Sequence, residues 1–183
     1  MRIITGKLKG RSIPIPKTGR LRPTSDRTKE GLFSVIAART FFEHTRVLDL
    51  FAGSGNLGFE ALSRGAESCL FVDSHPDHCR RVEKTAQQLD IEEQVNIQVS
   101  DVDIFLEKPL DSFHFIFADP PYDYYDMDGL IKMVMERGWM KETGWFILEH
   151  DKRHDFSDHP HCVFSKPYGR TVVTIFKQNP DDF

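Results

Sequence analysis

The feature that most limits the fold is the stretch DLFAGSGNLG at residues 49–58. An apolar strand ends there in a glycine-rich turn that matches GxGxxG, and a helix begins directly after it. Glycine allows a ligand to approach the backbone closely, and a helix N-terminus offers unpaired N–H groups to a carboxylate or phosphate. This combination predicts an α/β fold in which strand, turn and helix bind a small ligand together.

From residue 46 onward, short apolar strands alternate with helical patterns, which is typical of a parallel α/β sheet. We expect strands at residues 46–51, 68–73, 95–100, 113–120 and 144–150. Two β-like runs joined at Gly169 predict a closing antiparallel hairpin. The sequence therefore predicts a Rossmann-like, mostly parallel sheet in a three-layer α/β/α arrangement, ending in a frayed tail at residues 179–183.

The N-terminus differs from the rest in charge. Residues 1–30 hold nine Lys/Arg and two acidic residues, a formal charge of +7, which leaves −11 for the remainder. Apolar and basic residues alternate around Gly6 and Gly10, which favours a short twisted hairpin, and RTKEGLFSVIAAR predicts a helix capped by Ser25 or Asp26. Because Lys and Arg supply contacts to phosphates, we expect a substrate-side appendage at 1–40 beside a main domain at 41–178.

Composition excludes several classes of protein. No apolar run is long enough to span a membrane, and the first residues lack a secretory signal, so we expect a cytoplasmic protein. The cysteines at 69, 79 and 162 contain no CxxC pair, which argues against disulfides and zinc. Histidines cluster near the C-terminus, but their spacing fits no common ligand pattern. We interpret them as surface-loop residues and expect no metal: His150, His154, His159 and His161, beside Cys162.

Two acidic residues follow the pattern of a nucleoside site. Asp73 ends the second strand, where it can accept from both hydroxyls of a ribose, and Asp49 can hold an ammonium or its bound water. GxGxxG with an acid on the second strand also occurs in dinucleotide-binding dehydrogenases, so NAD remains an alternative at this point. An ammonium partner for Asp49 favours a ligand that carries an amino acid.

The more specific motif is Asp119-Pro120-Pro121-Tyr122, at the end of the fourth strand. The amino group of a nucleobase is a poor nucleophile because its lone pair is delocalised into the ring. The Asp119 carboxylate and the Pro120 carbonyl provide two acceptors that favour a pyramidal nitrogen, and the paired prolines stiffen the turn. Tyr122 can stack on a base pulled out of its helix. The motif indicates methylation of a base amino group, with Asp119 acting either as proton acceptor or only as the group that orients the amine.

At this point the chain resembles the class I methyltransferases, and among them the RsmD-like 16S ribosomal RNA guanine-N2 methyltransferases. The segments that carry this resemblance are MRIITGKLKGR, RPTSDRTKEGLFSVI, VLDLFAGSGNLGFEALSRGA, FVD, SDVDIFL, DPPY, EH and YGRT. It implies S-adenosylmethionine as methyl donor and ribosomal RNA, in a small subunit or its assembly intermediate, as partner. The expected donor-binding residues are Asp49, Phe51, Ala52, Gly53, Ser54, Gly55, Asp73, Asp101, Val102 and Asp119. The expected substrate-binding residues are Arg2, Lys7, Arg11, Arg22, Pro23, Thr24 and Tyr122, and the expected catalytic residues are Asp119, Pro120, Pro121 and Tyr122.

Two positions depart from the family pattern, which usually has Glu at Asp73 and a small residue at Asn56. Asp73 can still accept from a ribose hydroxyl, and Asn56 is expected to cap the helix. Tyr124 and Tyr125 either extend the base pocket or begin the next helix.

Three other functions remain as alternatives. The first is an adenine-N6 or cytosine-N4 methyltransferase acting on DNA or RNA, which the lack of room for a target-recognition domain disfavours. The second is an NAD-dependent oxidoreductase, which leaves Asp119 to Tyr122 unexplained. The third is a non-catalytic RNA-binding module, which would bind the donor without turnover.

Overall fold

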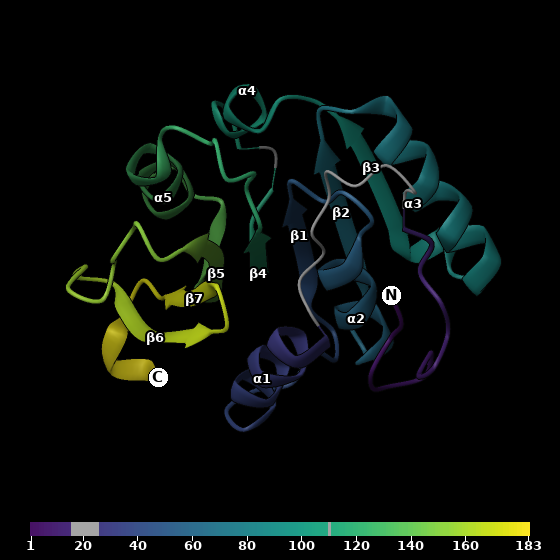
Figure 1. Cartoon of the computed structure of the whole chain (residues 1–183), viewed down its shortest axis with the longest axis horizontal. Coiled ribbons are helices and arrows are strands. Elements are labelled where there is room, and N and C mark those ends of the chain that lie inside the picture. Colours follow the sequence, from purple (N-terminus) through teal and green to yellow (C-terminus); the bar gives the residue numbers. More distant parts are fainter. Residues whose placement is uncertain (16–25, 110) are drawn as a thin grey trace.

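The computed structural model describes residues 1–15, 26–109 and 111–183. Within those residues, seven strands form one sheet in the order β3-β2-β1-β4-β5-β7-β6 (Figure 1). The strands are β1 Arg46–Leu50, β2 Ser68–Asp73, β3 Val95–Val99, β4 Phe113–Ala118, β5 Met140–Asp151, β6 Cys162–Tyr168 and β7 Thr171–Phe176. Neighbours from β3 to β5 pair parallel, and β7 pairs antiparallel with both β5 and β6. The predicted parallel sheet with a C-terminal antiparallel hairpin is confirmed.

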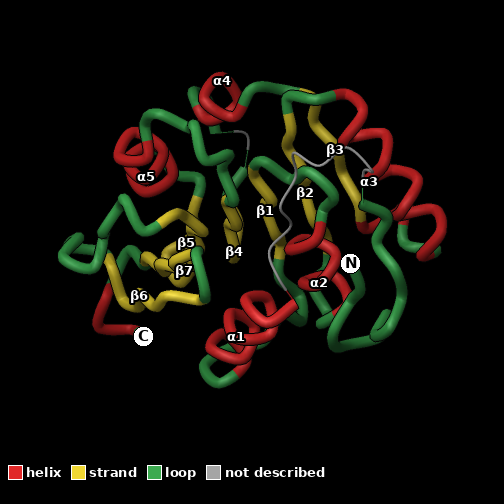
Figure 2. The backbone as a smooth tube through the Cα atoms, in the orientation of Figure 1, coloured by secondary structure: helices red, strands yellow, loops and turns green. Residues whose placement is uncertain are grey.

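Helices flank the sheet on both faces (Figure 2). The described helices are α1 Asp26–Ala37, α2 Asn56–Ser63, α3 Pro76–Leu89, α4 Val102–Leu106 and α5 Met127–Glu136, with 3-10 turns η1 Glu92–Gln94 and η2 Pro180–Asp182. Apolar residues of α1, α2 and α3 share one core with Val47 of β1, whereas those of α4 and α5 share the other core with Leu48 and Leu50. Because successive side chains of a strand point to opposite faces, β1 separates the two cores and the molecule has the predicted three layers.

The third glycine of GxGxxG sets the contact between α2 and β2. A Cβ atom on Gly58 would lie 2.4 Å from Cε1 of Phe71 and 2.7 Å from Sγ of Cys69, both on β2. The helix can therefore lie directly on the sheet only because this position has no side chain.

The N-terminal residues reverse direction with little regular structure. In residues 1–15 an antiparallel bridge joins Arg2 to Ser12, Ile3 N donates to Arg11 O at 2.9 Å and Ile13 N donates to Met1 O at 2.8 Å, so the two arms pair as in the expected short hairpin. The backbone also bonds α2, because Lys7 N donates to Ser63 O at 2.8 Å and Leu8 N donates to Ser63 Oγ at 2.9 Å. Candidate cap Ser25 lies outside the described residues, and α1 begins at Asp26.

A buried ion pair joins this segment to the two nearest helices. Lys29 of α1 and Glu60 of α2 are fully buried, with Nζ and Oε2 3.3 Å apart. Lys29 Nζ also donates to Arg2 O at 2.7 Å, while Glu60 accepts from the backbone nitrogens of Ile4 and Thr5. A single carboxylate thus fixes the start of the chain to α1 and α2.

The expected frayed tail is wrong. Residues 180–182 form the 3-10 turn η2, and the ring of Phe183 packs 5.2 Å from that of Trp145. The guanidinium of Arg39 lies 4.3 Å above the same phenylalanine ring. Apolar contact therefore holds the last residues against the body. None of the described helices is long and apolar enough to cross a membrane.

Candidate active site

A large cavity lies at the carboxyl ends of the parallel strands. It has a volume of about 1010 Å³ and opens where the strand order reverses, between β1 and β4. Open α/β sheets bind ligands at such a reversal, because the two connections leave toward opposite faces. The predicted residues that line it are Asp49, Phe51, Ala52, Gly53, Ser54, Asp73, Asp101, Val102, Asp119, Pro120, Pro121 and Tyr122. With the exception of Gly55, which does not line it, the structure thus collects around one space the residues expected for the donor and those expected for the base.

The glycine-rich turn lines this cavity. Phe51, Gly53 and Gly55 have φ of 56°, 55° and 76°, in the left-handed region that favours glycine. Gly55 is the N-cap of α2, so the expected cap at Asn56 is wrong. The Asn56 side chain instead accepts from Lys29 Nζ at 2.7 Å, which ties the first turn of α2 to the buried ion pair.

Asp49 is a buried carboxylate beside this turn. Its Oδ2 accepts from the backbone nitrogen of Gly58 at 2.9 Å, and its side of β1 faces α2. Burial raises the pKa of Asp49 to about 8; the Gly58 hydrogen bond opposes this shift, and the nearby charge of Asp73 adds to it. A cation entering the cavity beside Asp49 would stabilise its ionised form, so the position suits an ammonium group.

Asp73, at the end of β2, already has three donors. Its Oδ2 accepts from Gly53 N at 2.8 Å, its Oδ1 accepts from His75 N at 2.8 Å, and His78 Nδ1 lies 3.1 Å from both oxygens. An ionised carboxylate offers about four acceptor positions, so few remain for a ligand. The two histidines also line the cavity, and sequence reasoning missed both.

Asp101 and Val102, which the sequence motifs predict to flank adenine, line another part of the cavity. Asp101 caps α4, accepting from Asp103 N at 2.9 Å, and Val102 is buried. The hydroxyl of Tyr124 donates to Asp103, and its ring stands edge-on to Phe51 with centroids 5.2 Å apart. Burial and the bond to Asp103 raise the pKa of Tyr124. The helix α4 itself was not predicted.

The geometry supports neither alternative for Tyr124 and Tyr125, which were an extension of the base pocket and the start of the next helix. These residues precede α5, which begins at Met127 after its N-cap Asp126, and neither lines the large cavity. Tyr125 is 84% exposed.

The Asp119 to Tyr122 turn lies across the cavity from the glycine-rich turn. Pro120 is buried, and the Pro121 carbonyl accepts from Tyr124 N at 2.9 Å, which closes the turn. The side chain of Tyr122 is free to meet a ligand, because the residue is 52% exposed while its carbonyl accepts from Arg153 Nη2 at 2.7 Å. Arg153 in turn pairs with Asp151 at the end of β5. Sequence reasoning missed Arg153, which lies 31 residues away along the chain.

The predicted basic contacts are not brought to this turn. Lys7 Nζ donates to Gln94 Oε1 at 2.7 Å, at the amino end of β3 and so at the opposite edge of the sheet. Arg11 donates to the Gln88 carbonyl near the end of α3, and Arg2 pairs with Asp26 at 3.5 Å. The predicted residues Arg22, Pro23 and Thr24 lie outside the described residues. A basic residue that does line the cavity is Arg170, in the turn between β6 and β7.

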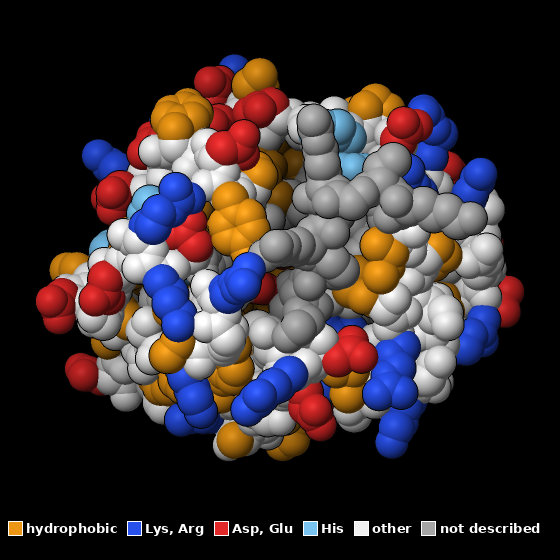
Figure 3. All heavy atoms as spheres, in the orientation of Figure 1, with side chains coloured by type: hydrophobic (Ala, Val, Ile, Leu, Met, Phe, Trp, Pro, Cys, Tyr) orange, Lys and Arg blue, Asp and Glu red, His pale blue; other side chains and the backbone are white. Residues whose placement is uncertain are grey.

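Basic side chains are distributed over the visible face of the molecule. Figure 3 shows Lys and Arg side chains over α1, α3 and β6. The acidic net charge of the protein therefore does not exclude contacts with phosphates at several points around the cavity.

The expectation that the C-terminal histidines belong to surface loops is wrong for His150. This residue is 4% exposed on β5, and its Nε2 lies 2.8 Å from Thr174 Oγ1. Burial lowers its pKa, although contacts with Asp151 oppose this effect. His154, His159 and His161 are partly buried. His150 also lines the large cavity, so it adds a polar side chain to the wall.

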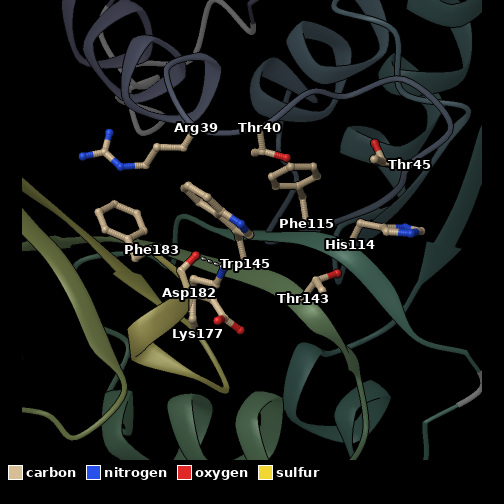
Figure 4. A pocket seen from close by; sticks show the side chains of 10 residues that line it. All are labelled: Arg39, Thr40, Thr45, His114, Phe115, Thr143, Trp145, Lys177, Asp182 and Phe183. Atoms are coloured by element: carbon tan, nitrogen blue, oxygen red, sulfur yellow. Dashed lines mark hydrogen bonds between the residues drawn. The ribbon is translucent and has the colours of Figure 1, made fainter.

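A second cavity, of about 300 Å³, lies at the amino ends of β1, β4 and β5 (Figure 4). Figure 4 shows Trp145 at its centre with Phe183 beside it. The Lys and Arg side chains of this cavity already contact other residues that line it: Lys177 Nζ donates to Asp182 O at 3.0 Å, and Arg39 stacks on Phe183. The candidate chemistry therefore lies in the large cavity.

Comparison with known proteins agrees with this architecture. The family model described as "Conserved hypothetical protein 95" matches residues 1–177. The chain belongs to this family. It is 35% identical over 184 residues to "Putative rRNA methyltransferase YlbH" of Bacillus subtilis, covering 97% of this chain and 99% of that protein. It is 36% identical over 156 residues to "Ribosomal RNA small subunit methyltransferase D" of Haemophilus influenzae, covering 83% and 79%.

A solved structure of similar sequence has the same fold. "Putative methyltransferase yhhF from Escherichia coli" superposes with a TM-score of 0.85 at 26% identity, covering 98% of this chain and 99% of that one. The resemblance to RsmD-like methyltransferases that the sequence motifs indicated is therefore confirmed, as is the class I methyltransferase sheet.

Proposed function

We propose that this protein transfers a methyl group from S-adenosylmethionine to the exocyclic N2 amino group of a guanine in 16S ribosomal RNA. The observation that carries the proposal is the single cavity that joins Asp49, the glycine-rich turn and Asp73 to Asp119–Tyr122. Relatives named as small-subunit rRNA methyltransferases support the class of substrate. Such RNA is handled in the cytoplasm, within a small subunit or its assembly intermediate.

The residues on the donor side fit S-adenosylmethionine in charge and size. Asp49 suits the ammonium of its methionine part, and the first N–H groups of α2 suit the carboxylate. The remaining acceptor position of Asp73 suits a ribose hydroxyl, and Val102 with Phe51 offers apolar surface to adenine. A cavity of about 1010 Å³ is large enough for the donor and a base together. When bound, the donor supplies a methyl group on a positively charged sulfur.

The residues on the base side would hold the amino group for attack. Asp119 and the Pro120 carbonyl accept its two hydrogens, which directs the nitrogen lone pair toward the methyl carbon. Tyr122 stacks on the flipped guanine. As the nitrogen–carbon bond forms, the carbon–sulfur bond breaks, and the amine then loses one proton to Asp119 or to water. Most of the rate acceleration comes from holding both reactants in line.

We further propose that residues 1–40 serve as the RNA-side appendage of a methyltransferase domain at 41–178. Arg2, Lys7 and Arg11 would contact phosphates beyond the target nucleotide, because they lie away from Tyr122. The segment of Arg22 to Thr24 would border the substrate. Arg170 provides a further positive charge at the cavity itself.

The test uses small ribosomal subunits from a strain that lacks the gene, incubated with the purified protein and tritiated S-adenosylmethionine. Variants Asp119→Ala and Asp119→Asn are compared with Asp128→Asn, which alters an exposed acid on α5. We expect N2-methylguanine at one position in 16S RNA with wild type and Asp128→Asn, and at least about 100-fold less with Asp119→Ala. An equal loss with Asp119→Asn, which keeps one acceptor oxygen, would assign the proton to Asp119, whereas a smaller loss would leave Asp119 as the group that orients the amine.

The same purified protein, tested also with DNA and with NAD, separates the alternatives. Label on adenine or cytosine, or on DNA alone, would replace the guanine assignment. Calorimetric binding of NAD without binding of S-adenosylmethionine would favour an oxidoreductase. Donor binding with no label on any nucleic acid would favour a non-catalytic RNA-binding module.

A further inference from the structure

Three potential metal ligands meet where β2 passes into α3. Asp73, His75 and His78 each offer one ligand atom, and these three atoms lie within 4.8 Å of one another. In the described part of the chain, this is the group of His, Cys, Asp and Glu side chains that lie close enough together to hold one metal ion. We propose that these side chains form a binding site for a divalent transition metal, and that metal and the ribose end of the methyl donor exclude one another there. The second part rests on the proposed function.

The distances suit a tetrahedral ion. Oδ1 of Asp73 is 3.4 Å from Nδ1 of His75 and 3.1 Å from Nδ1 of His78. Two ligand atoms of tetrahedral zinc, each about 2.0–2.1 Å from the metal, lie about 3.3 Å apart. The two imidazole rings stack, with centroids 4.7 Å apart and planes 26° from parallel. The side chain of His75 is 71% exposed, so it can rotate to adjust the distance between the two imidazole nitrogens to that of a tetrahedral ion.

The local backbone brings the ligands into this arrangement. His75 is the N-cap of α3 and Pro76 occupies its first turn, which places His78 about one turn beyond His75. The Asp73 carboxylate is held by the backbone nitrogens of Gly53 and His75, which fix its orientation as outer-shell groups fix ligands in metal sites. Loss of a metal would thus leave the carboxylate in place.

The donor set favours a particular class of ion. Two imidazoles with one carboxylate suit Zn²⁺, Co²⁺, Ni²⁺ or Cu²⁺, whereas Mg²⁺ and Ca²⁺ prefer oxygen ligands throughout. The three residues line the large cavity, so a fourth coordination position faces the space that a ligand enters. Three protein ligands with one open position is an arrangement in which water or another small ligand completes the shell.

Metal and ribose would compete for the same carboxylate. On metal binding, Nδ1 of His78 changes from a donor to Asp73 into a ligand of the ion, so the ion takes over that position at Oδ1 and draws on the charge of the carboxylate that a ribose hydroxyl would use. A bound ion with its water also occupies the cavity wall beside the ribose position. Occupancy would therefore weaken donor binding, with no effect on the Asp119 side of the cavity.

The first experiment detects the site without using methylation. Chelator-treated protein is titrated with Co²⁺, and the visible absorption of the four-coordinate ion is followed, with Zn²⁺ added afterwards as competitor. We expect one Co²⁺ per chain for wild type, displaced by Zn²⁺, and at least a 10-fold weaker signal for His75→Ala and His78→Ala. His159→Ala serves as the control and retains the signal, because His159 lies in the loop between β5 and β6. Thermal melting establishes that the variants are folded. Equal signals in all four proteins, or none in wild type at millimolar Co²⁺, would overturn the site.

The second experiment tests exclusion by calorimetry with S-adenosylmethionine. Saturating Zn²⁺ should raise the donor Kd of wild type at least 10-fold and leave the donor Kd of His75→Ala unchanged. An unchanged wild-type Kd would overturn exclusion while leaving the metal site. If metal-free wild type binds no donor, the proposed function fails and exclusion fails with it, whereas the Co²⁺ spectrum still decides the site.

Discussion

The backbone nitrogen of Gly53 donates to Oδ2 of Asp73 at 2.8 Å, so the glycine-rich turn after β1 is fixed by the last residue of β2. The ends of two neighbouring strands therefore form one unit. The position of the turn depends on a carboxylate 20 residues further along the chain.

Replacing Asp73 should affect both stability and donor binding. Asp73→Ala leaves the buried nitrogen of Gly53 and the partly buried nitrogen of His75 without this acceptor and should lower the free energy of unfolding by about 2 kcal/mol. Asp73→Asn keeps one carbonyl oxygen and should lose about half as much. Urea unfolding measures both, with Asp77→Asn as control, because Asp77 is exposed and its pair with Arg80 is on the surface. Equal stability of Asp73→Ala and Asp77→Asn would contradict a role for Asp73 in holding the turn.

Asp49 should make stability fall as pH rises. Its folded pKa, about 8, lies above the ordinary value of 3.8, so between these limits the folded state retains a proton that the unfolded state has lost. Stability should therefore decrease from pH 4 to pH 8, by up to about 1 kcal/mol per pH unit. Asp49→Asn removes this dependence. Unfolding curves at several pH values measure the difference, and parallel pH profiles of wild type and Asp49→Asn would refute the raised pKa.

Removing the buried lysine should be severely destabilising. Lys29→Met leaves Glu60 buried with the partly exposed Arg64 as its remaining ion-pair partner and should lower the free energy of unfolding by about 3–5 kcal/mol. The double variant Lys29→Met/Glu60→Gln should recover part of this loss, because it also removes the buried charge. Lys84→Met on the exposed face of α3 is the control. A loss below about 1 kcal/mol for Lys29→Met would show that water reaches the pair.

Tyr122 should affect turnover on RNA without affecting the donor. Loss of one stacking contact weakens base binding by about 1–3 kcal/mol, so kcat/KM of Tyr122→Ala should fall by about 5-fold to 150-fold. Tyr122→Phe retains the ring and should stay within about 2-fold of wild type, and the donor Kd should be the same in all three proteins. Initial rates on small subunits measure the first quantity. A wild-type rate for Tyr122→Ala would remove stacking from the proposed mechanism.

The fold could be predicted because its signals are local. Each apolar run, in β1, β2 and β4, and the turn at Gly53 spans only a few consecutive residues, and α/β connection rules then order the strands. The short helix α4 escaped prediction because five residues carry too little periodicity. The packed tail escaped it because QNPDDF has turn-like composition, whereas its one aromatic residue finds Trp145 only in the folded chain.

The site could be predicted only as far as its motifs reach. Asp49, Asp73 and Asp119 each lie at or next to the last residue of a strand, which places them together at one edge of a parallel sheet. By contrast, the pairing of Lys29 with Glu60, the bond from Arg153 to Tyr122 and the burial of His150 all arise between distant segments. No pattern of spacing reports such contacts.

The antiparallel direction of β7 has a consequence for how such a protein can diverge. Because β7 starts opposite Asp151, the turn that carries Arg170 reaches the same edge as the ends of β1 and β4. The part of the cavity proposed for the donor thus comes from the first strands, and Arg170 on its rim comes from a hairpin that lies last along the chain. An insertion in that hairpin would change the shape of the rim without altering the residues proposed to hold the methyl donor.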